Sequence, residues 1–242
     1  MASMSRFFYD APLNAHQTVS PDEVTAKHVL QVLRMGVGDK IQLTNGKGIV
    51  ATAVITVAEK KKCSVFIEDM TTEPYPQPAL HLAIAFTKNT SRNEWLLEKA
   101  TELGVSSIFP LIAKRSERER IRHDRWKNIL ISAMLQSQQA HLPYLAEAIS
   151  LEQLLADHAS TAQKLVGHCV ENIERQALSK ALQPGSDSLI LIGPEGDFTN
   201  EEIELCLSAG CVGISMGHTR LRTETAAMAA CAYFNMINYE KA

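Results

Sequence analysis

The sequence predicts an α/β protein with two domains, in which a small β-rich domain precedes a larger one built on a mainly parallel sheet. Three observations support this class. From Leu80 onward, short apolar runs alternate with helical patterns, the β-α-β order of parallel sheets. Three prolines within the eight residues Thr71–Pro78 mark a boundary. Ahead of that boundary, apolar runs are joined by hairpin-type turns. We therefore assign residues 1–72 to the first domain, 73–78 to a linker and 79–242 to the second.

The first domain opens with a predicted strand over Ser5–Tyr9. A helix is expected to start at Ser20-Pro21-Asp22-Glu23, with Ser20 as the N-cap, proline at the first helical position and acids in the first turn. This helix should end near Gly36. The rest of the domain is β-rich, with strands expected at Ile41–Leu43, Ile49–Val57 and Ser64–Glu68, joined by turns at Asn45-Gly46 and Lys60–Lys62.

The second domain begins with a strand at Leu80–Phe86 and a helix at Arg92–Leu103 that Gly104 closes. The next strand, Val105–Phe109, is expected to end at Pro110. Another strand is expected at Lys164–Cys169. This order continues to the C-terminus and predicts a mainly parallel sheet.

The last quarter of the chain carries the most specific pattern. The apolar strand Leu189–Ile192 runs into the turn Gly193–Gly196, and Thr199 with Glu202 has the spacing of a capping box that starts a helix. A second buried strand, Val212–Met216, ends in its own glycine turn at Gly217 and precedes a closing helix from Thr223. Both glycine turns therefore follow strand ends, where open parallel sheets bind ligands.

Composition narrows the class of protein. With 45% hydrophobic and 21% charged residues the chain is typical of soluble globular proteins, and no apolar run approaches the ~20 residues of a membrane span. Five cysteines without a CxxC pair favour reduced thiols in the cytoplasm over disulfides or a zinc site, and no metal is implied. The net charge of −3 conceals a local excess of positive charge. Residues 88–127 hold ten Lys/Arg against six Asp/Glu, whereas residues 128–211 hold three against eleven. The first segment is the kind of basic footprint that a phosphate backbone requires.

Two motifs of this last quarter resemble a known family. Gly193-Pro194-Glu195-Gly196 and Leu221-Arg222-Thr223-Glu224-Thr225-Ala226 resemble the paired signatures of the bacterial 16S rRNA uridine-N3 methyltransferases, the RsmE family of the SPOUT class. Further resemblance lies at Lys88, Arg92 and Glu98–Gly104 and at Arg125-Trp126. Gln139 and Asp197 stand where many relatives carry Arg and Gly.

The resemblance implies a trefoil-knotted C-terminal domain that binds S-adenosylmethionine, a PUA-like N-terminal barrel that binds RNA, and a homodimer acting on 16S rRNA of the small ribosomal subunit. Glycines at strand ends let a backbone approach adenosine closely. The residues expected at the cofactor are His168, Gly193, Pro194, Glu195, Gly196, Ser215, Met216, Gly217, Leu221, Thr225 and Ala226. Those expected at RNA are Arg6, Arg34, Lys88, Arg92, Arg115 and Arg118.

Catalysis is assigned to Arg222 and Glu224. Neutral uridine is a poor nucleophile at N3, so the site must favour the uracilate, and a guanidinium offers a fixed charge with a planar fork of donors. Glu224 is either the base or a partner that holds Arg222, and water could equally take the N3 proton. The alternative role of Arg222 is an ion pair with Glu195 or Glu224.

Other interpretations remain open at this stage. The basic run Lys114–Arg122 is interleaved with acids, so it is either a self-paired solvated segment or a phosphate-contacting arm. The whole chain could instead be a non-catalytic RNA-binding assembly factor, or a methyltransferase that acts on tRNA. The apolar face of the helix from Ala226 to Ile237 fits either a core or a subunit interface.

Overall fold

The computed structural model describes residues 4–59, 62–116 and 121–239, and its contacts divide the chain into two units. The N-terminal unit contains the chain up to Tyr75 together with Met134–Leu142. The C-terminal unit contains Pro76–Ala133 and the chain from Pro143 onward. The division at Tyr75 falls inside the proline-rich stretch, whereas the return of Met134–Leu142 to the N-terminal unit has no signal in the sequence.

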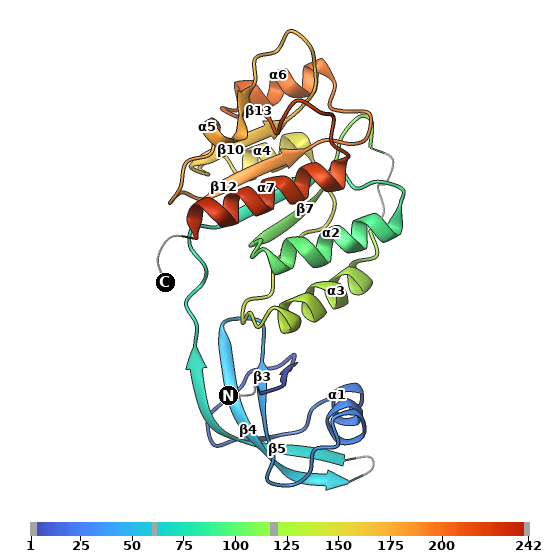
Figure 1. Cartoon of the computed structure of the whole chain (residues 1–242), viewed down its shortest axis with the longest axis vertical. Helices are drawn as coiled ribbons and strands as arrows, with labels where there is room; N and C mark the ends of the chain where they lie inside the picture. The colour runs from blue at the N-terminus through green and yellow to red at the C-terminus, as the bar shows by residue number, and fades with distance from the viewer. Residues whose placement is uncertain (1–3, 60–61, 117–120, 240–242) are drawn as a thin grey trace. The chain divides into compact units, whose positions relative to one another are not determined.

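The N-terminal unit is built on a five-stranded sheet in the order β1-β3-β4-β5-β2. Its strands are β1 (Arg6–Phe8), β2 (Thr18–Val19), β3 (Lys40–Thr44), β4 (Ile49–Glu59) and β5 (Lys62–Thr72), drawn in blue to cyan in Figure 1. The expected hairpin is present, because β3 and β4 pair antiparallel across the turn at Asn45-Gly46. The side chains of Ile41, Leu43 and Ile55 are completely buried in the core of this unit.

The helix of this unit starts later than predicted. Helix α1 covers Glu23–Lys27, and its N-cap is Asp22, whose carboxylate accepts a 2.7 Å hydrogen bond from the amide of Thr25. The prediction of Ser20 as the cap is wrong, since its hydroxyl lies 3.2 Å from that of Ser64 instead. The helix continues as one π-helical turn, η1 (His28–Val32).

The C-terminal unit is built on a parallel sheet of eight strands, in which seven follow the order β11-β13-β10-β12-β6-β7-β8 and β9 pairs with β7. The strands are β6 (Leu80–Ile84), β7 (Ser107–Ile112), β8 (Tyr144–Leu145), β9 (Ile149–Ser150), β10 (Gln163–Gly167), β11 (Gln176–Ala177), β12 (Ser188–Ile192) and β13 (Val212–Ser215). Every residue of β12 is buried, as expected for a strand covered on both faces of a parallel sheet.

The prediction that Pro110 ends its strand is wrong. Strand β7 continues to Ile112, and Pro110 is in register with Ile84 of β6. On the other edge of β7, β8 pairs only with Ser107 and Ile108, and β9 pairs only with the strand's last two residues. Pro110 therefore lies between two short pairings, where a missing N–H leaves no ladder bond unmade.

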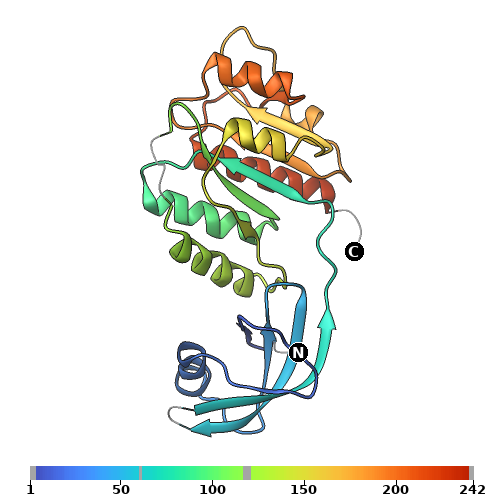
Figure 2. The same cartoon turned by 180° about the vertical axis from the view of Figure 1, so that it is seen from behind.

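Helices cover both faces of this sheet (Figures 1 and 2). On one face α2 (Thr90–Glu102) packs against α7 (Thr223–Asn238), and on the other α4 (Leu151–Asp157) contacts α6 (Asn200–Ser208). The remaining helices are α3 (His123–Gln136) and the short α5 (Leu178–Ala181). The apolar face of α7 belongs to the core of the chain itself, because Ala227, Ala230 and Phe234 are buried within it.

Candidate active site

A cavity of about 910 Å³ lies at the carboxyl ends of β10, β12 and β13. Three loops line it, formed by residues 167–171 after β10, residues 192–198 after β12 and residues 214–217 with 219–223 after β13. Arg92 of α2, Arg115 after β7 and Ala226 of α7 complete most of the wall. The two glycine turns that the sequence places at strand ends therefore meet at one cavity.

The first glycine turn is fixed by packing and by one hydrogen bond to α7. A Cβ added to Gly193 would lie 2.9 Å from a ring carbon of Phe198, whose side chain is completely buried. The hydroxyl of Thr223 donates to the carbonyl of Gly193 over 3.1 Å. A Cβ on Gly196 would meet only the side chain of Arg115, at 3.4 Å. Close packing therefore requires glycine at position 193 more strictly than at 196.

The capping box predicted at α6 is present and has a second function. The Thr199 side chain accepts from the amide of Glu202, and the Glu202 carboxylate accepts from the amide of Thr199. The same carboxylate accepts a 2.7 Å hydrogen bond from the amide of Lys114. The guanidinium of Arg115 then donates to the carbonyl of Gly196 over 2.7 Å. The start of the basic run is thus held against the first glycine turn.

The second turn depends on backbone conformation. Gly217 has a φ of +128°, a region that L side chains rarely adopt, and no heavy atom outside its chain neighbours lies within 4 Å of an added Cβ. Met216 and Leu221 line the cavity on either side of this turn. Glycine at 217 is therefore needed for the backbone rather than for space.

The loop after β10 carries His168 and is fastened to the first turn by Asp197. Burial, reinforced by the nearby charge of Arg175, lowers the pKa of His168, so the ring is neutral at pH 7. Among the described residues neither ring nitrogen has a hydrogen-bond partner. Asp197, with a φ of +62°, accepts hydrogen bonds from the amides of Cys169 (2.6 Å) and Phe198 (2.8 Å). The residue that departs from the common glycine thus joins two loops of the cavity.

The arginines at the cavity differ in how they are paired. Arg92 contacts two carboxylates, with Nε 3.4 Å from Glu224 Oε1 and Nη1 3.7 Å from Glu195 Oε1. Arg222 is exposed, lines the same cavity and forms no ion pair with any described residue. Both carboxylates considered as partners of Arg222 are therefore taken by Arg92.

The structure brings most of the predicted cofactor residues to the cavity. Those that line it are His168, Gly193, Pro194, Glu195, Gly196, Ser215, Met216, Gly217, Leu221 and Ala226, together with Arg222, Arg92 and Arg115. Thr225 and Glu224 are absent from the lining. Glu224 is buried in the first turn of α7, and Arg118 lies outside the described residues.

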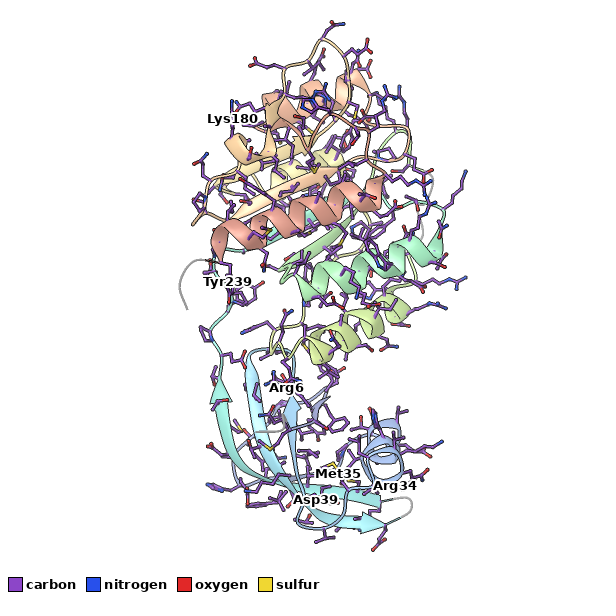
Figure 3. The ribbon with its side chains drawn as sticks, in the orientation of Figure 1. Arg6, Arg34, Met35, Asp39, Lys180 and Tyr239 are labelled. Carbon is purple, nitrogen blue, oxygen red and sulfur yellow. The ribbon has the colours of Figure 1, made fainter. Side chains whose placement is uncertain are left out.

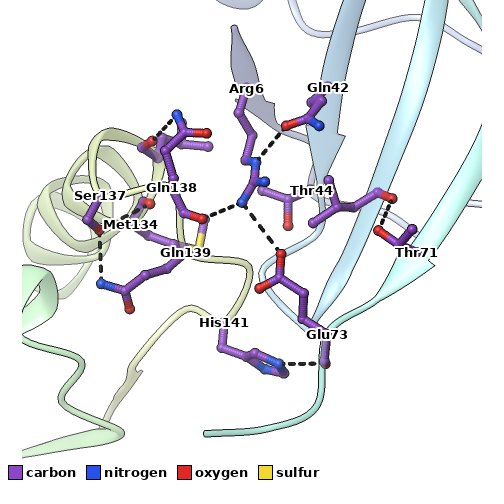
Figure 4. Close-up of polar contacts among 12 residues, drawn as sticks. Arg6, Gln42, Thr44, Thr71, Glu73, Met134, Ser137, Gln138, Gln139 and His141 are labelled. Carbon is purple, nitrogen blue, oxygen red and sulfur yellow. Dashed lines mark hydrogen bonds and ion pairs between the residues drawn. The ribbon is translucent and has the colours of Figure 1, made fainter. Parts of the chain in front are cut away.

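Arg6 occupies a different environment from the other residues expected at RNA (Figure 4). Its side chain is 8% exposed, and its guanidinium donates to the Gln42 side chain at 3.1 Å and to the Gln138 carbonyl at 2.6 Å, with Glu73 4.0 Å away. The ring of His141 contacts the Glu73 carbonyl at 3.0 Å. Arg6 therefore ties β1 to the segment Met134–Leu142, and we do not retain it as an RNA contact.

Arg34 and Lys88 are exposed. Arg34 has a φ of +56° and lies on the turn that follows η1, beside Met35 and Asp39 in Figure 3. The Asp39 carboxylate accepts from the amide of Gly36 over 2.7 Å and stabilises that turn. Lys88 lies between β6 and α2 in the C-terminal unit.

Several cavity residues were missed in the sequence, among them Cys169, Glu171, Arg175, Asp197, Thr219 and Arg220. The first three follow β10, which lies between β12 and β13 in the sheet. His168 of the same loop was expected at the cofactor, and the order of the strands explains why its neighbours also reach the cavity.

The described residues contain no helix long and apolar enough to cross a membrane. Within the same ranges, no group of three or more His, Cys, Asp or Glu side chains is arranged to hold a metal ion.

The cavity fits a nucleoside-sized cofactor. Its volume lies within the ~300–1,000 Å³ of small-molecule sites. Residues of the two glycine turns form much of the lining, and apolar residues such as Ile192, Ile214 and Met216 supply surface for a flat base. The exposed guanidinium of Arg222 remains for a second reactant.

Comparison with known proteins agrees with this geometry. Residues 73–235 match the RNA methyltransferase domain family, and residues 22–68 match the RNA methyltransferase PUA domain family. A Ribosomal RNA small subunit methyltransferase E from Rickettsia conorii is 32% identical over 211 residues, covering 87% of this chain and 86% of the relative.

Two solved structures are similar over nearly the whole chain. A probable rRNA-methyltransferase from Porphyromonas gingivalis has 37% identity and a TM-score of 0.89, covering 97% of this chain and 98% of that one. A Ribosomal RNA small subunit methyltransferase E from Neisseria gonorrhoeae, bound to S-adenosyl methionine, has 30% identity and a TM-score of 0.85, covering 98% of each chain.

Proposed function

This chain belongs to the RNA methyltransferase family represented by these relatives, and we propose that it methylates N3 of a uridine in 16S rRNA of the small ribosomal subunit with S-adenosylmethionine as donor. The observation that carries this proposal is the junction of both signature turns at one cavity, together with Arg222, which has no ionic partner among the described residues. The reaction then takes place in the cytoplasm, where the small subunit is assembled.

S-adenosylmethionine, when bound, supplies a methyl group on a positively charged sulfur. In this chain the backbone at Gly193–Gly196 and Gly217 would hold the adenosine part, with Met216 and Leu221 against the base. Two connections keep the turns in place for this task, the Thr223–Gly193 hydrogen bond and the Asp197 bonds to the neighbouring loop. A preformed site of this kind places donor and acceptor in line, which can contribute much of the acceleration.

Arg222 would stabilise the uracilate. The guanidinium stays charged at all relevant pH values and can donate to a uracil oxygen as negative charge spreads over the ring. Arg222 precedes α7, and the positive N-terminal end of this helix adds to the same field. Glu224 is buried and does not line the cavity, so we assign it to the support of this region and assign the N3 proton to water.

The N-terminal unit would bind the rRNA, with Arg34 on its exposed turn as one phosphate contact and Lys88 as another from the C-terminal unit. The trefoil knot and the homodimer are part of the same proposal. Sedimentation of the purified chain tests the dimer independently of activity.

The proposal is tested with labelled S-adenosylmethionine and small subunits purified from cells that lack this gene. Calorimetry should show a donor site on the chain, and nucleoside analysis of the rRNA should show N3-methyluridine. Gly193→Val is the matched test of the cavity, because its side chain would displace the buried Phe198 ring, whereas Gly196→Ala meets only the Arg115 side chain. Donor binding with no methylated product would instead support a non-catalytic assembly factor, and product in tRNA alone would reassign the substrate.

A further inference from the structure

Arg92 projects from a rigid part of the chain. The Asn89 side chain caps α2 by accepting from the amide of Arg92 over 3.1 Å. The preceding turn is locked by Asn93, which accepts from the amide of Thr87 (3.2 Å) and donates to its carbonyl (2.8 Å). Both Thr87 and Asn93 are buried. The base of the Arg92 side chain is therefore held in place before any ligand binds.

The guanidinium of Arg92 connects the two signature motifs. It contacts Glu195 of the first glycine turn at 3.7 Å and Glu224 of α7 at 3.4 Å. The Glu224 side chain is only 10% exposed, and its Oε2 has no hydrogen-bond partner among the described residues. A buried carboxylate in this state attracts any cation within reach strongly, because few solvent dipoles screen it.

Arg222 is the cation closest to that carboxylate along the chain. It lies two residues before Glu224, immediately ahead of α7, and borders the same cavity as Arg92. Without Arg92, the buried charge of Glu224 would be uncompensated, and the exposed side chain of Arg222 has no competing ion pair among the described residues to keep it from turning toward Glu224.

We infer that Arg92 is a positioning residue that occupies Glu195 and Glu224 and thereby leaves the Arg222 guanidinium available to the uracil. This inference rests on the proposed role of Arg222. It replaces the expectation that Arg92 contacts RNA phosphate, since one guanidinium beside two carboxylates forms a group of net negative charge, which repels phosphate.

The experiment measures single-turnover methyl transfer and donor affinity in the full-length protein with small subunits as substrate. Arg92→Ala should lower the rate about tenfold or more, a part of the ~10²–10³ that one oriented charge donor contributes, with donor affinity within a few-fold. Arg92→Lys, which still offers a charge to both carboxylates, should recover much of the rate. The double variant Arg92→Ala/Glu224→Gln should be faster than Arg92→Ala, because the charge that captures Arg222 is gone.

Lys99→Ala is the matched control. Lys99 lies on the same helix and also pairs with two carboxylates, Glu98 at 2.7 Å and Glu102 at 2.8 Å, but it does not line the cavity. Its removal should leave the rate unchanged. Donor binding by each variant, measured by calorimetry, confirms that the variant is folded.

Two results would overturn the inference: an unchanged rate in Arg92→Ala, or a loss that the Glu224→Gln change does not relieve. If the slope of log RNA affinity against log salt is lower in Arg92→Ala than in the unmodified chain, Arg92 contacts RNA phosphate, as the sequence first suggested. Failure of the underlying proposal looks different, because Arg222→Ala would then be fully active whatever Arg92 does.

Discussion

Arg6 in the N-terminal unit and Arg222 in the C-terminal unit are both arginines predicted to be functional, but their guanidinium groups differ in burial and in pairing. The guanidinium of Arg6 is almost completely buried and bonded to Gln42 and Gln138 (Figure 4). That of Arg222 is exposed at a cavity and has no ionic partner among the described residues. Hydrogen bonding and ion pairing therefore distinguish a structural arginine from a ligand-binding one. A guanidinium whose donors are satisfied within the protein stabilises the fold, whereas one without partners can bind a ligand.

The largest effect is expected at Arg222. Arg222→Lys should keep donor affinity within a few-fold yet reduce methyl transfer by about 10²–10³, because lysine carries the charge without the planar fork. Rapid-quench kinetics at saturating donor measures this rate. Full activity in both Arg222→Lys and Arg222→Ala would show that Arg222 has no catalytic role.

Arg6 should affect stability instead of catalysis. Arg6→Ala leaves the Gln138 carbonyl and the Gln42 side chain without this donor, which should cost about 1–3 kcal/mol of the free energy of unfolding. Urea unfolding of the two proteins gives the difference. If Arg6→Ala is as stable as the unmodified chain but binds RNA less tightly, Arg6 is a ligand contact after all.

Arg34 sharpens the comparison within the N-terminal unit. Its side chain is exposed on the turn after η1 (Figure 3), so Arg34→Ala should weaken RNA binding and reduce the slope of log affinity against log salt by about 1. Binding titrations at several salt concentrations provide the slope, with Arg6→Ala as the matched comparison at constant net charge. Equal slopes for the unmodified and Arg34→Ala proteins would exclude Arg34 from the interface.

The smallest effect concerns pH and the C-terminal unit. Burial lowers the pKa of His81 and of His158, whose rings lie 5.1 Å apart, from the ordinary 6.5. The unfolded chain therefore binds protons below pH 6.5 that the folded chain resists, so the free energy of unfolding is at its full value above pH 6.5 and falls as the pH drops below it.

Urea unfolding at pH 7.5 and 5.5 measures this loss, to which His168 also contributes, and His158→Gln should reduce it by removing one of the three histidines whose pKa is lowered. An equal loss in His158→Gln and the unmodified chain would assign the pH dependence to other residues.

The parts of the site that could be predicted are those encoded by local signals. The apolar run before Gly193, the capping box of Thr199 and Glu202, and the glycine at 217 each act over a few residues, and the structure contains all three. The family resemblance rested on the same short motifs and is confirmed by the matches over most of the chain.

What could not be predicted depends on residues far apart in the sequence. Pro110 was predicted to end its strand, but β7 can contain this proline because β8 and β9 pair with β7 on either side of it. Arg6 was expected to contact RNA, and Gln138, whose carbonyl accepts from its guanidinium instead, lies 132 residues away in the sequence. Arg92 looked like an RNA contact because Glu195 and Glu224 reach it only after the sheet has formed. In each case the residue type could be read locally, but the partner that decides its role comes from a distant part of the sequence.

The central claim is that the cavity containing Arg222 methylates N3 of a uridine in small-subunit rRNA. The most direct measurement is the mass-spectrometric nucleoside profile of that rRNA from cells that lack the gene and carry a plasmid that is empty or encodes either the unmodified chain or Arg222→Lys. We expect N3-methyluridine with the unmodified chain and its near absence with both the empty plasmid and Arg222→Lys. N3-methyluridine at the same level in all three would contradict it.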